Sequence, residues 1–537
     1  MVFMRFIFSF PLFPAIGLTI LFPVIALGAN HASKEICLET RTLPQSPNPS
    51  SRDVSQEAHT QAEATIANVS QEARTEIELT IADVSRKALG NNLDLRIEKF
   101  APRISEEQVR AAEADFDPDM SFGGTLTRTY ADTDLSEIDS RGEEMSAAIG
   151  KRFSSGIQTS VGVSASKSKT DVNTVGETDE YATSANLTLT LPLLKNRGRE
   201  VNTRNISLSR NNHKIAELTL RQTAIDTISQ AQILYWNLYK AQQELDVQKK
   251  SLELAKKFSE LSRGRAKIGH IASIDTLQAD AEVAAREEWV IIAENDVRNR
   301  RRSLLYFILG RCETGITVKL LQKPTYEKAV FDENRLFLSA LENRTDYLIA
   351  KLDIKNAETN VVYAKNQTLP TGDLSATLSV NGLGESWGKA YENAGSGEDY
   401  SGSLGISLEF PWGMKKDKAA HQIALYENRR SRTRLFQAEQ NILSDVRTAL
   451  DNLTEADKRY HTTTLSKQLA EKKLSAEERK FGLGLSTSYN VLLYQRDLTD
   501  AAVRTISAVI DYQLALIHLD RVTGMTLERH AIGAEEF

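Results

Sequence analysis

The chain has 537 residues, a net charge of −6, 26% charged residues, 28 glycines, 12 prolines and two cysteines. A net charge this small gives no basis for binding nucleic acid, and two cysteines are too few for a disulfide framework. The eight histidines are scattered and no catalytic, phosphate-binding or metal-binding motif occurs. We therefore expect neither an enzyme nor a cofactor.

An apolar segment near the start of the chain, residues 6–26, follows Arg5 and ends in the small residues Ala26, Gly28 and Ala29. A basic residue, an apolar stretch and small residues in this order predict a secretory signal peptide over residues 1–29. A retained membrane anchor is the alternative. Beyond this segment no uncharged apolar run approaches the roughly 20 residues of a spanning helix, so any membrane span must consist of strands.

Residues 30–87 form a predicted linker that begins with several prolines and continues with a short repeat. The sequence Val54–Ala58 recurs 15 residues later as Val69–Ala73, and loosely again from Val84. Because the repeat is polar and rich in alanine, it favours helix. It is either a duplicated helical spacer or an additional coiled-coil collar.

The remainder of the chain is predicted to be a tandem duplication. Ala88-Leu89 recurs as Ala340-Leu341, a separation of 252 residues, whereas Pro192 recurs as Pro411, a separation of 219 residues. We therefore expect one repeat over 88–310, a connector over 311–339, a second repeat over 340–527 and a tail over 528–537. The fall in separation places 33 additional residues in the first repeat, between Pro118 and Pro192.

Segments of alternating polarity, about 119–191 and 373–410, predict strands. In the first segment Met120, Phe122, Leu126 and Tyr130 alternate with serine, glycine and threonine. Each strand is about ten residues long, which fits a tilted strand in a bilayer, and the Ser/Thr/Gly face suits a water-filled lumen. A soluble sandwich would also alternate. The charged segments 132–143 and 171–180 are expected to be external loops.

The additional residues of the first repeat predict one more hairpin, over 144–169. The first repeat then has four strands and the second has two. Six strands cannot close a water-filled barrel, so a pore would require several copies of the chain.

Four long proline-poor segments predict helices: 203–263, 273–309, 417–480 and 488–522. Leu238, Leu245 and Leu252 are seven residues apart, which is coiled-coil spacing, and 60 helical residues span about 90 Å. A short glycine turn separates the helices of each pair, at 267–275 and 481–490. We expect the glycine to end one helix and Ser273 or Ser488 to cap the next.

In these features the chain resembles the TolC-like outer membrane efflux protein family, over about residues 88–527. The resemblance depends on the duplication and on the order of several motifs. These motifs are Ala88-Leu89-x-Asn91-Asn92, Phe116-Asp117-Pro118, Leu191-Pro192-Leu193-Leu194, and Gly-x-x-x-Ser-x-Asp/Asn from Gly269 and from Gly484.

The resemblance implies a mixed α and β fold in which three protomers share one outer-membrane β-barrel, with 4 to 6 strands from each protomer. The family pattern has two strands per repeat, so the barrel would have either twelve or eighteen strands. A periplasmic coiled-coil barrel of helices would continue it. The homotrimer would contact outer-membrane lipid and would conduct substrates passively from an inner-membrane pump or ABC exporter.

The resemblance also implies that the helical tips dock onto a periplasmic adaptor protein. The corresponding residues here are Gly269, Ile271 and Ser273 in the first repeat, and Gly484, Leu485 and Ser488 in the second. A structural turn is the alternative, because every helical hairpin needs one.

Family members narrow the periplasmic entrance with rings of acidic side chains. Glu477 and Glu478 are the nearest candidates, because threefold carboxylate rings attract cations into a narrow pore. The alternative is a solvated helix face.

For the whole chain, the rival class is a non-conducting coiled-coil structural protein, which would have no use for amphipathic strands. Drug efflux and type I protein secretion are not distinguished by the sequence.

Overall fold

The computed structural model describes residues 76–133, 136–172, 176–268, 272–313, 315–328 and 331–529, all within one compact unit, Gln71–Phe537. The predicted signal peptide, the first two copies of the 15-residue repeat, Gly269, Ile271 and the last eight residues of the tail lie outside the described residues. Within the described residues, no helix combines the length and the apolar character that a membrane crossing requires.

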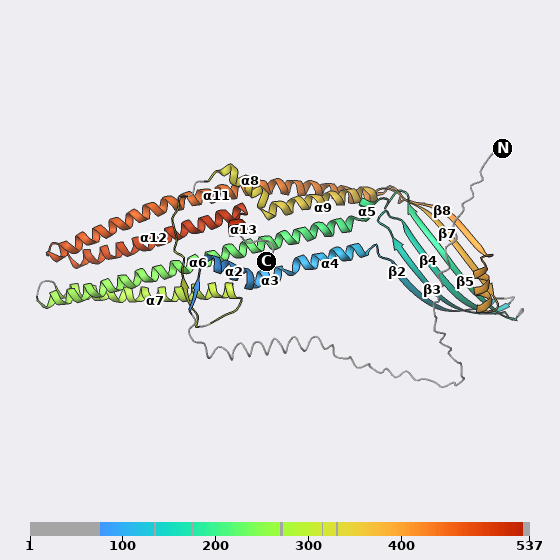
Figure 1. Ribbon diagram of the computed structural model, residues 1–537, viewed down its shortest axis with the longest axis horizontal. Helices are drawn as coiled ribbons and strands as arrows, with labels where there is room; N and C mark the ends of the chain where they lie inside the picture. The colour runs from blue at the N-terminus through green and yellow to red at the C-terminus, as the bar shows by residue number, and fades with distance from the viewer. Residues whose placement is uncertain are drawn as a thin grey trace, which may run out of the picture. The chain divides into compact units, whose positions relative to one another are not determined.

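Six antiparallel strands form one sheet in the order β2-β3-β4-β5-β7-β8. They are β2 (Asp119–Thr133), β3 (Ser136–Arg152), β4 (Gln158–Val172), β5 (Gly176–Pro192), β7 (Thr371–Gly384) and β8 (Tyr400–Glu409). Four strands come from the first repeat and two from the second, which confirms the extra hairpin. β2 and β8 are the edges of the sheet, so it is not closed within this chain (Figure 1).

The strand register collects the apolar side chains on one face of the sheet. One row of directly paired residues crosses all six strands and is apolar throughout: Phe122, Ala147, Val163, Ala185, Val380 and Tyr400. Phe122 is 78% exposed and Tyr400 is 76% exposed, so nothing in this chain covers the row at the sheet edges. An apolar face this open fits contact with lipid.

The expectation of ten-residue strands with charged loops at 132–143 and 171–180 is wrong. β2 to β5 contain 15 to 17 residues, and most of the charged segments lie inside them. Cross-strand ion pairs accompany this extension: Arg128 Nη2 lies 3.0 Å from Asp139 Oδ2, and Lys167 Nζ lies 3.5 Å from Asp179 Oδ2. Opposite charges on neighbouring strands stabilise the pairing of the charged strand ends, which extend beyond the apolar part of the sheet.

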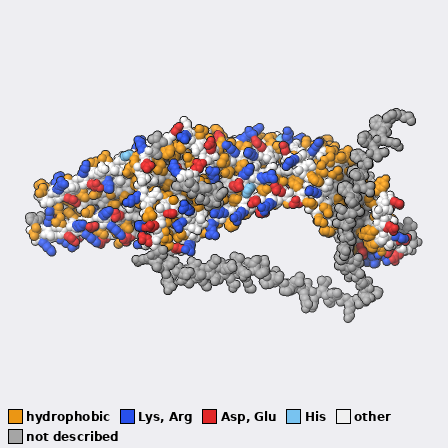
Figure 2. Space-filling view, in the orientation of Figure 1, with side chains coloured by type: hydrophobic (Ala, Val, Ile, Leu, Met, Phe, Trp, Pro, Cys, Tyr) orange, Lys and Arg blue, Asp and Glu red, His pale blue; other side chains and the backbone are white. Residues whose placement is uncertain are grey.

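Four long helices form two antiparallel hairpins (Figure 1). The first pairs α6 (Arg204–Lys267) with α7 (Ser273–Leu309), and the second pairs α11 (Lys415–Gly482) with α12 (Ser488–Thr523). At about 1.5 Å per residue, α6 and α11 are each about 100 Å long. Lys/Arg and Asp/Glu side chains are interspersed along the visible face of the helices (Figure 2), which is typical of solvated helix faces.

The structure also contains shorter helices. They are α2 (Ile81–Asn91), α3 (Leu93–Glu98), α4 (Phe100–Ala114), α5 (Arg199–Asn202), α8 (Glu333–Asn343), α9 (Thr345–Gln367), α10 (Trp387–Ser396) and α13 (Thr526–Arg529). The helices join the sheet where β2 and β7 begin and where β5 and β8 end. The opposite strand ends carry the β2–β3, β4–β5 and β7–β8 connections.

The two repeats have the same closing contact. Gly310 ends α7 with φ 68° and Gly524 ends α12 with φ 72°, a left-handed conformation that glycine adopts without strain. A Cβ on Gly310 would lie 2.5 Å from the Asn91 carbonyl oxygen, and one on Gly524 would lie 2.9 Å from Asn343 Cβ. In each repeat, the C-terminal end of the last helix therefore packs against the asparagine that is the last residue of the first helix.

A two-stranded parallel sheet was not predicted. β1 (Glu76–Leu79), in the predicted linker, pairs with β6 (Thr317–Leu320), in the predicted connector. Leu79 and Val318 are buried in the core cluster that contains Tyr235, Trp236 and Leu304. Strands of four residues have too little periodicity to be recognised, and pairing across 241 positions of sequence is a tertiary contact.

Candidate functional site: the tips of the helical hairpins

The tip of the second hairpin is built by a Schellman turn. Leu485 N donates to Lys480 O at 2.9 Å and Gly484 N donates to Phe481 O at 3.1 Å, with Gly484 at φ 74°. This pattern satisfies the last carbonyls of α11 and requires a left-handed residue, usually glycine, at that position. Gly484 therefore has the predicted role, whereas Gly269 lies outside the described residues.

The predicted caps are wrong in both hairpins. The N-cap of α12 is Thr487, whose hydroxyl accepts from Asn490 N, and Ser488 is already the first helical residue and is buried. The N-cap of α7 is Ala272, with no capping side chain, and Ser273 is exposed inside the helix. The sequence offered Thr487 and Ser488 side by side, and helix boundaries are uncertain by one or two residues.

Apolar side chains are exposed around both tips. Leu483 and Leu485 are 76% and 75% exposed in the second tip, next to the exposed Tyr489. In the first tip the exposed apolar residues are Ile268, Ile274 and Leu277. Apolar surface at the end of a hairpin has no partner within the described part of this chain and is typical of a contact surface for another protein.

Glu477 and Glu478 have different surroundings although they are adjacent. Glu477 is 8% exposed and accepts a hydrogen bond of 2.5 Å from Ser486 Oγ, while Lys480 Nζ lies 3.6 Å away. Its carboxylate therefore holds the turn against α11. Glu478 is exposed, so of the two candidates it is the one that faces solvent.

Arg265 joins the two tips, a contact that the sequence reading missed. Arg265 Nη1 donates to Phe481 O at 2.9 Å, and its guanidinium lies 4.6 Å from the Phe481 ring centroid. The hydrogen bond satisfies a carbonyl at the C-terminal end of α11, where a positive charge is favourable. Arg265 follows the predicted end of this helix at residue 263 by two positions, so a basic residue close to a helix end was the available signal, but its partner is 216 residues away.

The buried Arg286 was also missed. It is in α7, directly after Ala284 and Ala285, and its Nη1 donates to Ser251 O at 3.0 Å and Ser251 Oγ at 2.7 Å. Ser251 is in α6, so this arginine fastens the two helices of the first hairpin. A charged residue inside an alanine-rich stripe was the available signal.

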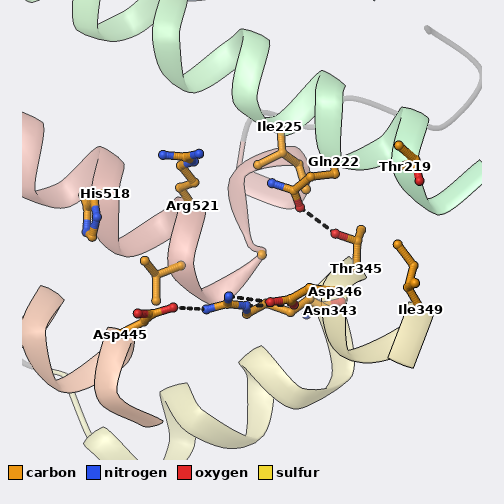
Figure 3. Close-up of a pocket in the computed structure, with 13 residues that line it drawn as sticks. Thr219, Gln222, Ile225, Asn343, Thr345, Asp346, Ile349, Asp445, His518 and Arg521 are labelled. Carbon is orange, nitrogen blue, oxygen red and sulfur yellow. Dashed lines mark hydrogen bonds and ion pairs between the residues drawn. The ribbon is translucent and has the colours of Figure 1, made fainter. Parts of the chain in front are cut away.

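A cavity of about 410 Å³ lies where the two repeats meet, between α6, α9, α11 and α12. Arg344 donates to Asp445 Oδ2 at 2.8 Å and to Asp346 Oδ2 at 2.6 Å, and Thr345 Oγ1 lies 2.5 Å from Gln222 Oε1 (Figure 3). Burial and the nearby Arg521 lower the pKa of His518. Arg344 binds both aspartates within the second repeat, and Thr345 bonds to Gln222 of the first repeat, so we interpret the cavity as a structural joint.

No group of three or more His, Cys, Asp or Glu side chains is arranged to hold a metal ion in the part of the chain that the structure describes.

Comparison with known proteins agrees with this architecture. OprN, an outer-membrane channel, has 16% identity, a TM-score of 0.63, and coverage of 83% of this chain and 89% of its own. CusC, for which transmembrane channel formation is described, has 16% identity, a TM-score of 0.62, and coverage of 84% and 95%. The CmeC outer-membrane channel of Campylobacter jejuni has 15% identity, a TM-score of 0.62, and coverage of 87% and 94%. At these identities the likeness shows the fold.

No curated protein sequence matches the chain significantly. The sequence profile of the outer membrane efflux protein family matches residues 84–311 and 336–525, which is well over half of the chain and includes both hairpins and the six-stranded sheet. The chain therefore belongs to the outer membrane efflux protein family: it is an efflux channel protein of the outer membrane, with its helical part in the periplasm, and not an enzyme.

Proposed function

We propose that three copies of this chain close one barrel of eighteen strands, which serves as the exit duct of a tripartite efflux pump or a type I secretion system. The observation that carries the proposal is the open sheet. Its edge strands, β2 and β8, have unpaired backbone groups, and one of its faces is apolar and exposed. In a bilayer every backbone group must be paired, so the edges must meet the edges of other copies.

The opposite face of the sheet supports a water-filled interior. Its side chains are mostly serine, threonine and glycine, and several bond to each other across strands. Ser164 Oγ lies 2.8 Å from Ser184 Oγ, and Thr188 Oγ1 lies 3.3 Å from Thr377 Oγ1. Small hydroxyl side chains leave room for water and carry no charge that would bind a passing substrate.

The assembly is tested by light scattering of the full-length chain extracted from outer membranes in mild detergent. We expect the protein mass of three protomers, and reconstitution of that complex should produce conducting channels. A monomer would refute the duct, because six strands cannot enclose a pore. The coiled-coil structural protein would then be the better interpretation.

For the partners, the exposed apolar residues of the tips support docking of a periplasmic adaptor protein. Gly269, Ile271 and Ser273 belong to the first docking tip, and Gly484, Leu485 and Ser488 to the second. Gly484 shapes the turn and Ser488 is buried, so Leu485 supplies the contact in the second tip.

The docking proposal is tested with a photo-crosslinking amino acid at Leu485 in the native host. The matched control is Leu465, which is also exposed and apolar on α11 but lies about five helical turns from the tip. We expect a crosslink to an adaptor protein from position 485 only. Crosslinks to the same protein from both positions, or from neither, would contradict docking at the tip.

The acidic ring is proposed for Glu478, whose carboxylate is exposed. In bilayer recordings, Glu478→Gln should lower the preference for cations, because three carboxylates at a narrow entrance attract them. Unchanged selectivity would assign Glu478 to a solvated helix face.

A further inference from the structure

Helix α10 (Trp387–Ser396) lies at the strand ends that are remote from the helical hairpins (Figure 1). It connects β7 to β8. Thr183 Oγ1 of β5 donates to the Ala390 carbonyl oxygen at 3.1 Å, and Ala390 is fully buried. Residues alternate between the faces of a strand, so Thr183 shares the face of Ala185 and Leu187.

Two glycines of β7 allow α10 to pack this closely against the sheet. A Cβ on Gly382 would lie 2.0 Å from the Ala390 carbonyl oxygen and 2.5 Å from Ala394 N, and a Cβ on Gly384 would lie 2.7 Å from Ala390 N. Gly382 and Gly384 are on the same face as Leu378 and Val380. The sheet is therefore shaped to hold a helix against its outer, apolar side.

Helix α10 lies at the edge of the apolar part of the sheet, where the rows of paired residues change from uncharged to charged. Gly382 pairs with Thr183, which pairs with Ala165, so its row is still uncharged. Gly384 pairs with Tyr181, in the row that contains Lys167 and Glu143. The helix thus crosses the boundary between apolar and charged rows, which in a membrane protein is the position of the lipid headgroups.

The sequence of α10 fits that boundary. Trp387, Ala390, Tyr391 and Ala394 form one stripe at helical spacing, and Lys389 and Glu392 lie on the other side. Asn393 also contacts the sheet, because its Nδ2 donates to the Leu383 carbonyl oxygen at 2.7 Å. The alanines face the sheet, while Trp387 and Tyr391 are 39% and 58% exposed. The Trp387 ring lies 5.0 Å from the Tyr181 ring, so three aromatic side chains gather at this level. Tryptophan and tyrosine are enriched at membrane interfaces because their rings are amphipathic.

We propose that α10 lies in the headgroup layer of the outer leaflet of the outer membrane, where Trp387 and Tyr391 bind lipid and fix the depth of the sheet in the bilayer. The helical part of the protein is periplasmic, so the strand ends that carry α10 are on the external side. The occupant of this surface is lipid, because the surface continues the exposed apolar face of the sheet. The proposal depends on the outer-membrane location and not on the number of protomers.

The test uses an environment-sensitive fluorophore on a single cysteine at position 391, in the full chain with Cys37 and Cys312 replaced by serine and reconstituted in phosphatidylcholine vesicles. The variant Tyr391→Cys should lose fluorescence to lipids with a nitroxide at the headgroup or at a shallow acyl position, more than to lipids with a nitroxide at the chain end. It should be protected from a water-soluble quencher. The matched control is Glu392→Cys, one residue away on the polar side, which the water-soluble quencher should reach.

Quenching of both positions from water, without an effect of nitroxide lipids, would overturn the proposal and place α10 in solvent. Strongest quenching by chain-end nitroxides would also overturn it, because the helix would then lie in the hydrocarbon. In a second measurement Gly382→Ala should displace α10 and expose label 391 to water. Gly388→Ala, where a Cβ meets nothing within 4 Å, should leave the label protected. If Gly382→Ala does not fold, the first measurement still decides.

Discussion

At the scale of single residues, conformation and burial decide which side chains of the tips act and how. Gly484 is needed for its left-handed backbone, Glu477 for a hydrogen bond inside the turn, and Leu485 for its exposed apolar surface. All three lie within nine positions of the sequence, yet they have three different physical roles.

Replacement of Gly484 by alanine should destabilise the second tip, because a left-handed conformation costs a residue with a Cβ about 1–2 kcal/mol. Hydrogen exchange of residues 474–492 measures this as faster exchange. Gly482→Ala is the matched control, since that position is helical with open space around it. There alanine should leave exchange unchanged or slow it, because alanine is favoured in a helix. Equal effects of both substitutions would contradict the Schellman turn.

Asp520 makes stability depend on pH. Burial raises its pKa to about 6 although Arg529 Nη1 lies 2.5 Å from Oδ2. The folded protein then holds this proton more tightly than the unfolded chain, whose value is 3.8. This contribution to the free energy of unfolding is complete below pH 4 and lost as pH rises through 6, a change of about 2–3 kcal/mol.

The measurement is the thermal unfolding midpoint between pH 4 and 7.5 for the wild type and Asp520→Asn. The asparagine variant should lose the part of the pH dependence that lies between 4 and 6. Asp451→Asn, at an exposed position of α11, should retain it. Parallel profiles for the wild type and Asp520→Asn would refute the role of Asp520.

At the scale of elements, the two hairpins are held together near their tips by few contacts. Phe258, Phe481 and Val491 pack in one cluster, and Arg265 adds the bond to the end of α11. The rest of each tip is exposed. The first and second hairpin are therefore coupled there mainly through Phe481.

Arg265→Ala should uncouple the tips, because it removes a charge-assisted hydrogen bond and a cation–π contact worth about 1–3 kcal/mol together. The expected result is faster hydrogen exchange around Phe481, in the other repeat. Arg263→Ala is the control, because Arg263 bonds to Asp280 within its own hairpin. If both variants change exchange at Phe481 equally, the coupling does not depend on Arg265.

At the scale of the whole molecule, the hairpin β3–β4 sets the width of the proposed pore. Barrel diameter increases roughly in proportion to strand number, so eighteen strands enclose a lumen about one and a half times as wide as twelve. The hairpin adds two strands and returns the chain to the same membrane side. It therefore widens the barrel without moving the helices that flank it in sequence.

Replacement of residues 134–175 by Asn-Gly should produce a narrower trimer. The two-residue turn pairs Thr133 with Gly176 and places Phe122 opposite Leu187, so the apolar faces remain aligned. Single-channel conductance should fall to about half or less, since the lumen area scales with the square of the diameter. Light scattering should still give three protomers. An unchanged conductance would mean that β3 and β4 do not line the pore.

The sequence by itself determined the duplication, the six strands, and the four long helices to within a few residues at most ends. It did so because these features depend on local periodicity: period two for strands, 3.5 to 3.6 for helices, and glycine at the turns. The sequence also shows that the turn glycine occurs in both repeats, as Gly269 and Gly484. It shows likewise that Asn91 and Asn343, the last residues of α2 and α8, occupy equivalent positions.

Only the tertiary structure decided how far the strands extend, that β1 pairs with β6, and that Arg265 reaches Phe481. It also decided that α10 lies on the outer face of the sheet and that Glu477 is bound inside its turn while Glu478 is free to face solvent. These features depend on contacts between residues far apart in the chain or on the direction of one side chain. Local composition does not specify either, because the same residues fit a loop, a solvated helix face or a packed contact equally well.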